Sequence, residues 1–100
     1  MLKHIVLFTF KETSKKEEIE TIISSFLNLK NKISTLVAIE WGENISPENF
    51  HQGFTHCFTL LFDSMEALLA YQIDTHHIAF QKVLLPHMEK VFVVDYLLEQ

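Results

Sequence analysis

The alternation of hydrophobic and polar positions along the chain predicts four strands. The even positions of residues 2–10 are apolar with one exception, and the odd positions Ile5 and Leu7 are apolar as well, which is typical of a strand buried on both faces. Gly42 ends a second apolar run, and a polar loop over 43–53 follows it. The same criteria predict the remaining strands over residues 36–41, 54–62 and 91–97.

The spacing of apolar residues predicts a helix after the first strand. Ser14 and Glu17 stand three residues apart, as in a capping box, in which each side chain satisfies a free backbone N–H at a helix start. We therefore expect a helix from near Lys15 to about Asn31. Its apolar residues follow the spacing i, i+3, i+4, i+7, i+8 of a single helix face, at Ile19, Ile22, Ile23, Phe26 and Leu27.

Two shorter helical segments are expected between the last two strands. Asp63 or Ser64 can cap the first segment. Asp74 or Thr75 can cap the second, because short polar side chains accept hydrogen bonds from the free N–H groups of a helix start. Pro86 disturbs the second segment, since proline lacks the N–H that a helix interior needs.

The order of these elements predicts the fold class. Strand, helix, strand, strand, helix with an extra helical piece, and strand form the split βαβ pattern of an α+β ferredoxin-like sheet, in one domain over residues 1–100. Helices of this pattern cover only one face of the sheet. The other face is apolar through Ile5, Leu7, Phe92 and Val94, which indicates an association surface and predicts a homodimer with its sheets face to face.

Composition and charge exclude several classes of partner. Eight basic and thirteen acidic side chains give a net charge of −5, which argues against nucleic acid as a partner. No apolar run approaches the roughly 20 residues that span a bilayer, and no signal peptide pattern opens the chain, so no membrane partner is expected. Cys57 is the single cysteine, so a cytoplasmic location without internal disulfides is expected. The apolar content of 48% supports a second subunit as the partner.

Five polar residues in apolar surroundings are candidates for chemistry. His4 and His56 lie in the register of apolar residues on their strands, so both should point to one side of the sheet, where Asp95 can join them. Tyr71 and His77 lie on the covering helical segment. A histidine beside a carboxylate is held in one tautomer and can act as a general base, and a tyrosine hydroxyl can stabilise an oxyanion.

Other interpretations of these residues stay open. A histidine buried on a strand is usually a hydrogen-bonded structural residue, and a buried tyrosine is usually part of the core. Metal binding is not expected, because the adjacent His76 and His77 point to different sides of a helix and no HxxxH or HxH spacing occurs. Cys57 lies on the face opposite His56, so the two residues should not form a catalytic pair.

Several stretches together resemble the stress-responsive A/B barrel (Dabb) family. The resemblance covers nearly the whole chain, and the combination is specific although each stretch alone is weak. It implies a small ferredoxin-like protein that dimerises through its sheets into a dimeric α/β barrel. The stretches are residues 1–8 (MLKHIVLF), 53–56 (GFTH), 71–80 from Tyr71 to Phe80, and 93–96 (VVDY).

The resemblance also implies site residues. Plant polyketide cyclases of this family close the ring of a linear polyketide by an aldol condensation without a cofactor. By similarity, His77 is the general base, Tyr71 assists at the substrate carbonyl, and Asp95 orients the catalytic histidine. His4 and His56 match further polar pocket residues, and in an enzyme His4 would stabilise the carbonyl together with Tyr71. The ligand would be a small apolar molecule, and the apolar pocket lining would include Ile22, Ile23, Phe26, Leu27, Ile39, Phe58, Phe80, Val91 and Val93.

Three departures from the cyclase pattern keep other functions open. Phe26 replaces a pocket tyrosine, Gln81 stands where the cyclase has a glycine, and residues 74–77 read Asp-Thr-His-His instead of His-Pro-Ala-His. The alternative is a non-catalytic, stress-protective or ligand-binding dimer. A more distant alternative is a monooxygenase or haem-degrading protein on the same barrel, although nothing in the sequence demands haem.

Overall fold

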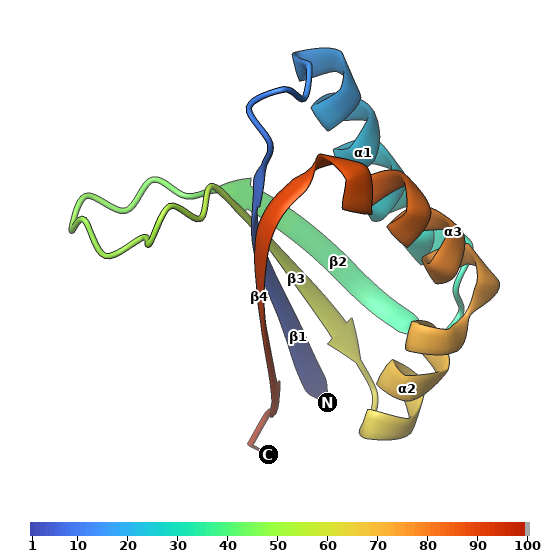
Figure 1. Ribbon diagram of the computed structural model, residues 1–100. Coiled ribbons are helices and arrows are strands. Elements are labelled where there is room, and N and C mark those ends of the chain that lie inside the picture. Colours follow the sequence, from blue (N-terminus) through green and yellow to red (C-terminus); the bar gives the residue numbers. More distant parts are fainter. Residues whose placement is uncertain (100) are drawn as a thin grey trace.

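A four-stranded antiparallel sheet carries helices α1, α2 and α3 on one of its faces (Figure 1). The computed structural model describes residues 1–99. It confirms the α+β ferredoxin-like order, with an extra helix before the last strand. The elements are β1 (Leu2–Phe10), α1 (Lys16–Asn28), β2 (Leu36–Glu43), β3 (His56–Phe62), α2 (Met65–Ile73), α3 (Thr75–Leu84) and β4 (Met88–Leu97), with 3-10 turns at Leu29–Asn31 and Leu85–His87.

Strand β1 lies inside the sheet, between β3 and β4, and β2 forms the far edge in the order β2-β3-β1-β4. The even-numbered residues of β1 are buried against the helices, and the odd-numbered residues of β1 are partly buried on the outer face of the sheet. The pairing sets His4 opposite Asp95 of β4 and opposite Leu60 of β3. This register decides which polar side chains can meet on the inner face.

The core beneath α1 is largely aromatic. Phe8 and Phe58 are fully buried on neighbouring strands, with ring centroids 5.4 Å apart. Phe26 of α1 stacks on Phe58 at 4.3 Å. Burying each of these side chains contributes about 1.5–3 kcal/mol to stability. The stack fixes α1 over β1 and β3.

Helix α1 begins next to Lys15 as predicted, but its capping pair is shifted by one residue. The backbone N–H of Lys15 donates to Glu18 Oε1 at 2.9 Å, so the acidic partner is Glu18 and not Glu17. The hydroxyl of Ser14 is instead hydrogen-bonded to His87 Nδ1 at 2.8 Å. A tertiary contact with the turn before β4 therefore replaces the expected local one.

Three predicted strand boundaries also shift. Strand β2 continues through Gly42 to Glu43, because these two residues pair with the start of β3. Strand β3 begins at His56 rather than Phe54, since the N–H of Phe54 turns back to the carbonyl of His51 at 2.9 Å. Strand β4 begins at Met88, where it pairs with the end of β1.

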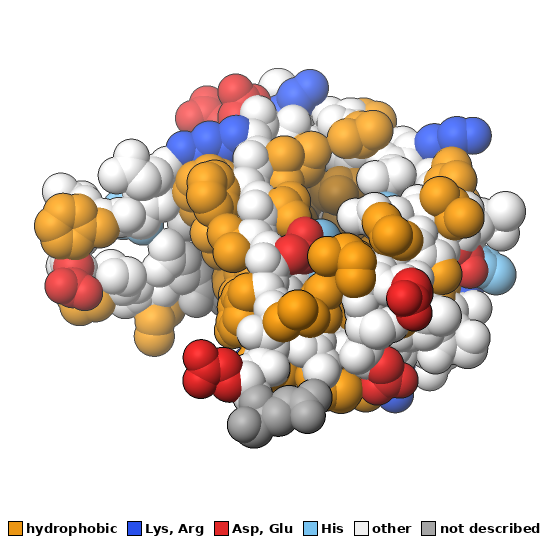
Figure 2. Space-filling model, turned by 90° about the horizontal axis from the view of Figure 1, so that it is seen from below, with side chains coloured by type: hydrophobic (Ala, Val, Ile, Leu, Met, Phe, Trp, Pro, Cys, Tyr) orange, Lys and Arg blue, Asp and Glu red, His pale blue; other side chains and the backbone are white. Residues whose placement is uncertain are grey.

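The outer face of the sheet is uncovered and apolar. Phe92 of β4 is 53% exposed, and Val94 beside it is also exposed, as the sequence pattern predicts. Figure 2 shows hydrophobic side chains gathered along the sheet. No helix within residues 1–99 combines the length and apolar character that crossing a membrane requires.

Asp74 joins α2 to α3 and caps the helix that carries His77. Its carboxylate accepts a hydrogen bond from the N–H of His76 at 2.8 Å, while Ser64 caps α2 in the same way. Asp74→Ala is expected to lower the free energy of unfolding by about 1 kcal/mol, because a free N–H at the helix start loses its partner. Urea denaturation would measure this loss. Asp74→Asn should retain most of the stability, and an alanine variant as stable as the wild type would contradict the capping role.

Candidate active site

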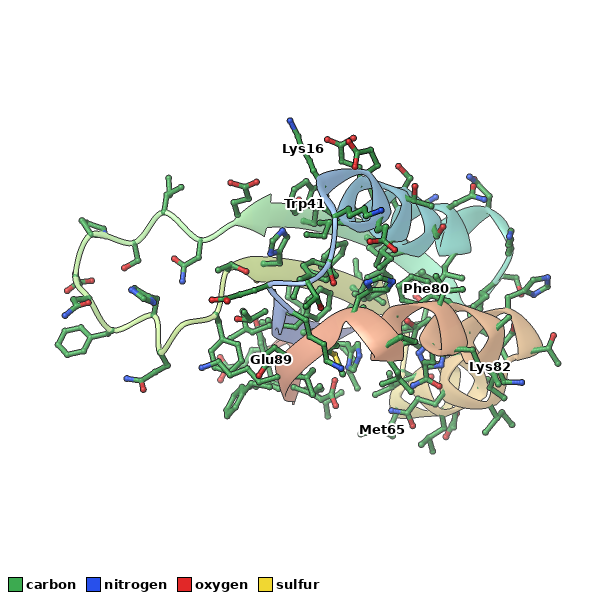
Figure 3. All side chains as sticks on the ribbon, turned by 45° about the horizontal axis from the view of Figure 1, so that its top comes forward. Lys16, Trp41, Met65, Phe80, Lys82 and Glu89 are labelled. Carbon is green, nitrogen blue, oxygen red and sulfur yellow. The ribbon has the colours of Figure 1, made fainter. Side chains whose placement is uncertain are left out.

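A cavity of about 430 Å³ opens between the sheet and helices α2 and α3. Figure 3 shows Phe80 pointing from α3 towards the sheet, whereas Lys82 points away from it. Polar groups at the cavity come from β1, α2 and α3, and apolar groups complete its wall. The lining residues are His4, Val6, Phe8, Phe26, Tyr71, Gln72, His77, Phe80, Gln81, Leu84, Leu85, Met88, Val91 and Val93.

His77 lies in the first turn of α3, with its ring half-buried against that of Tyr71 at a centroid distance of 4.2 Å. Its Nδ1–H donates to the carbonyl oxygen of Gln72 at 3.2 Å, which leaves Nε2 unprotonated in the neutral ring. Burial lowers the pKa of His77, as does the nearby His4, while the Gln72 carbonyl and Asp74 oppose this shift. His77 is therefore neutral at pH 7 and can accept a proton through Nε2.

Tyr71 lies between the two cavity histidines. It is 1% exposed, and its ring centroid is 6.3 Å from that of His4. Burial raises the pKa of Tyr71 well above its usual value. Its hydroxyl thus stays protonated at neutral pH and can donate a hydrogen bond to a carbonyl oxygen or an oxyanion.

Asp95 contacts His4, not His77 as the resemblance implies. The Nδ1–H of the buried His4 donates to the Asp95 carboxylate, because the two residues are opposite each other in the β1–β4 pairing. This hydrogen bond fixes the tautomer and orientation of the His4 ring. His77 is on α3, across the cavity, and takes its orientation from the Gln72 carbonyl.

His56 faces the helices as expected but lies outside the cavity. It pairs with Phe8. Phe8 lies four residues from His4 along β1, and this separation corresponds to roughly 13 Å along the strand. Its ring stacks on Trp41 at 5.7 Å, and its Nδ1 is 2.7 Å from the Thr55 hydroxyl. Burial lowers the pKa of His56, opposed by Glu43. Two histidines on one sheet face thus occupy separate environments.

The apolar lining agrees only in part with the residues that the resemblance implies. Some of the implied residues belong to the core or pack against it and do not line the cavity: Ile22, Ile23, Leu27, Ile39 and Phe58. The implied residues that do line it are Phe26, Phe80, Val91 and Val93.

Sequence reasoning missed Leu84 of α3 and Leu85 of the turn after it. His77, Phe80, Gln81 and Leu84 follow the spacing of one helix face, so helical periodicity applied to His77 could have identified Leu84. Gln81 lines the cavity without closing it. Among residues 1–99, no three His, Cys, Asp or Glu side chains are grouped so that they could hold a metal ion.

The two histidines with lowered pKa values make stability depend on pH. In the unfolded chain both titrate near the ordinary value of about 6.5, so as the pH falls through that value the unfolded state takes up protons before the folded state does. The free energy of unfolding should therefore decrease from pH 7.5 to pH 5. His77→Gln should weaken this dependence in urea titrations. Equal pH dependence in wild type and His77→Gln would contradict the assignment.

The amino-acid sequence of the chain is similar to those of known proteins. Residues 2–98 match the family described as Stress responsive A/B Barrel Domain. The stress-response A/B barrel domain-containing protein HS1 of Arabidopsis thaliana is 40% identical over 95 residues, which cover 95% of this chain and 87% of that protein. Olivetolic acid cyclase of Cannabis sativa is 28% identical over 95 residues, covering 95% of this chain and 94% of the cyclase.

Two solved structures are also similar. Hydroxynitrile lyase from Passiflora edulis superimposes with a TM-score of 0.93 at 28% identity, covering 99% of this chain and 94% of the lyase. A dimeric ferredoxin-like protein of unknown function from Bacteroides fragilis gives a TM-score of 0.73 at 30% identity, covering 95% of this chain and 93% of that one.

Proposed function

The chain belongs to the stress-responsive A/B barrel (Dabb) family, and from this premise we propose that it is a cofactor-independent enzyme for small apolar carbonyl compounds. The observation that carries the proposal is the half-buried His77 at the cavity. The Nδ1–H of His77 donates a hydrogen bond to the Gln72 carbonyl, and its ring lies beside that of Tyr71. The named relatives include a cyclase and a lyase. Aldol-type or lyase chemistry therefore suits this site best.

In the proposed reaction, His77 Nε2 removes a proton from the carbon next to a substrate carbonyl. The electron pair of that C–H bond moves onto the carbonyl oxygen and forms an enolate. The Tyr71 hydroxyl donates a hydrogen bond to this oxygen. His4, whose Nδ1–H is donated to Asp95, lines the cavity beside Tyr71. Asp95 acts as a positioning residue that holds the His4 ring. The enolate carbon then attacks a second carbonyl, and the protonated His77 returns its proton to the product.

The cavity favours a substrate with an apolar body and one polar end. Its volume of about 430 Å³ is within the range of roughly 300–1,000 Å³ that small-molecule pockets occupy. The polar side chains contributed by β1 and α2 include His4, Tyr71 and Gln72, and most of the remaining lining is apolar. The carbonyl is therefore expected beside Tyr71, with the hydrocarbon part against Phe80 and β4.

A ligand screen by thermal shift tests this proposal. Aryl and alkyl ketones at 100 times their Kd should stabilise the wild-type protein by about 2.7 kcal/mol. His77→Ala should reduce this stabilisation, because the substitution removes part of the cavity wall and its polar group. His76→Ala is the matched control, since His76 is adjacent but does not line the cavity. A ligand that stabilises His77→Ala and wild type equally would count against His77 as a site residue.

The outer face of the sheet is proposed to bind a second copy of the chain. Related structures are dimeric ferredoxin-like proteins. Ile5 and Leu7 of β1 continue the apolar surface of Phe92 and Val94. Isologous packing of this face would remove the exposed apolar surface from water in both copies.

A further inference from the structure

The loop between β2 and β3, residues 44–55, projects beyond the sheet and away from the helices (Figure 1). Its base is fastened by hydrogen bonds from the Asn44 N–H to the Thr55 carbonyl at 2.9 Å and from the Asn44 side chain to the Phe54 carbonyl at 3.0 Å. Lys90 of β4 donates to the Gln52 carbonyl and lies 4.3 Å above the Phe54 ring. The loop therefore has a defined shape.

This defined shape is unfavourable for an isolated chain. Ile45 is 90% exposed and Phe50 is 76% exposed, so the loop presents large apolar side chains to water. Asn49 and Gln52 have φ values of 63° and 55°, in the left-handed region that costs free energy for residues other than glycine. Strain combined with apolar exposure indicates that a partner covers the loop.

The side of the loop that faces the sheet is continuous with the apolar outer face of the sheet. A cavity of about 510 Å³ lies between them, with Leu7, Cys57 and Phe92 from the sheet and Phe50 and Phe54 from the loop. The rings of Phe54 and Phe92 meet edge to face, with centroids 6.2 Å apart. Sheet and loop thus form one concave apolar surface. Figure 2 shows hydrophobic side chains both on the sheet and on this loop.

We propose that the 44–55 loop is an arm that closes over a second copy of this chain, whose apolar side chains enter the cavity beneath the loop. This inference rests on the dimer proposed above, because the cavity is continuous with the proposed dimer face. A lipid surface is the less suitable partner. Glu43 and Glu48 are acidic, and no Lys or Arg occurs in residues 43–54, so anionic lipid would repel this segment.

The dimer dissociation constant of Phe50→Ser, measured by sedimentation equilibrium, tests the arm. We expect this constant to increase by about tenfold or more relative to wild type, as for an apolar side chain buried in an interface. Ile73→Ser is the matched control, because Ile73 is also 76% exposed but lies on α2, away from the loop. The control should dimerise like the wild type.

Each other outcome has a definite meaning. A dimeric wild type with an unchanged constant in Phe50→Ser would overturn the arm and leave the dimer intact. A wild type that stays monomeric at about 100 µM, well above the Kd of stable dimers, would overturn the dimer and the arm together. Binding of wild type to phosphatidylserine vesicles, lost in Phe50→Ser while self-association is unchanged, would assign the loop to a membrane and also overturn the proposal.

Discussion

Phe92→Glu is expected to convert the protein into a monomer. Phe92 is half-exposed on the outer face of β4, next to Val94 and in contact with Phe54. If this face is buried in a dimer, each subunit would bring one carboxylate into an apolar contact without a partner charge. An unpaired charge buried in this way costs about 3–5 kcal/mol, which raises the dissociation constant at least about a hundredfold. Light scattering after size exclusion would measure the change in mass.

A control of similar exposure separates this effect from the addition of charge. Leu69 of α2 is 52% exposed, against 53% for Phe92, and lies on the helical layer. Leu69→Glu should leave the oligomeric state unchanged. A Phe92→Glu variant that stays dimeric at micromolar concentration would show that the outer face of the sheet is not the interface.

His77→Gln is expected to lower kcat/KM by roughly 10² to 10⁴ for any carbonyl compound that the protein converts, because a general base contributes a factor of that size. Glutamine keeps a polar side chain in the cavity but cannot accept the proton. His76→Gln should retain full activity, since His76 does not line the cavity. Chromatography of the product over time would give both rates.

The pH profile gives an independent check on the same residue. Burial lowers the pKa of His77, so its neutral, basic form predominates at pH 7. The wild-type rate should be flat at and above neutral pH and should fall about tenfold per unit below the lowered pKa. A rate that keeps increasing with pH well above 7 would indicate a base other than His77.

The sequence predicted the fold well because its signals are local. The alternation within β1 and the helical spacing of Ile22 and Phe26 each follow from a few neighbouring residues, and both elements form as expected. The helix begins near Lys15 as expected, but its capping pair was misassigned, because Ser14 is hydrogen-bonded to His87, which is 73 residues away. Local capping rules cannot include such a tertiary partner.

The sequence could predict on which face of the sheet the candidate site residues lie, but not where along the sheet each residue lies. Alternation correctly placed His4 and His56 on the inner face, yet it gives no information on which strand residues are opposite each other. Only the observed pairing shows that Asp95 meets His4 and that His56 lies near Trp41. For the same reason, the residues of α3 that line the cavity could be identified only once the packing of α3 over the sheet was known.

The most direct test of the central claim is deuterium incorporation into a ketone probe. Propiophenone would be incubated in D2O at pD 7 with wild type, His77→Gln or His76→Gln, and loss of the α-hydrogen signal followed by NMR. If His77 removes protons next to a bound carbonyl, wild type and His76→Gln will exchange these hydrogens well above the background rate, and His77→Gln will not. Binding of the probe with background exchange in all three proteins would contradict the enzyme and favour a ligand-binding protein without catalysis.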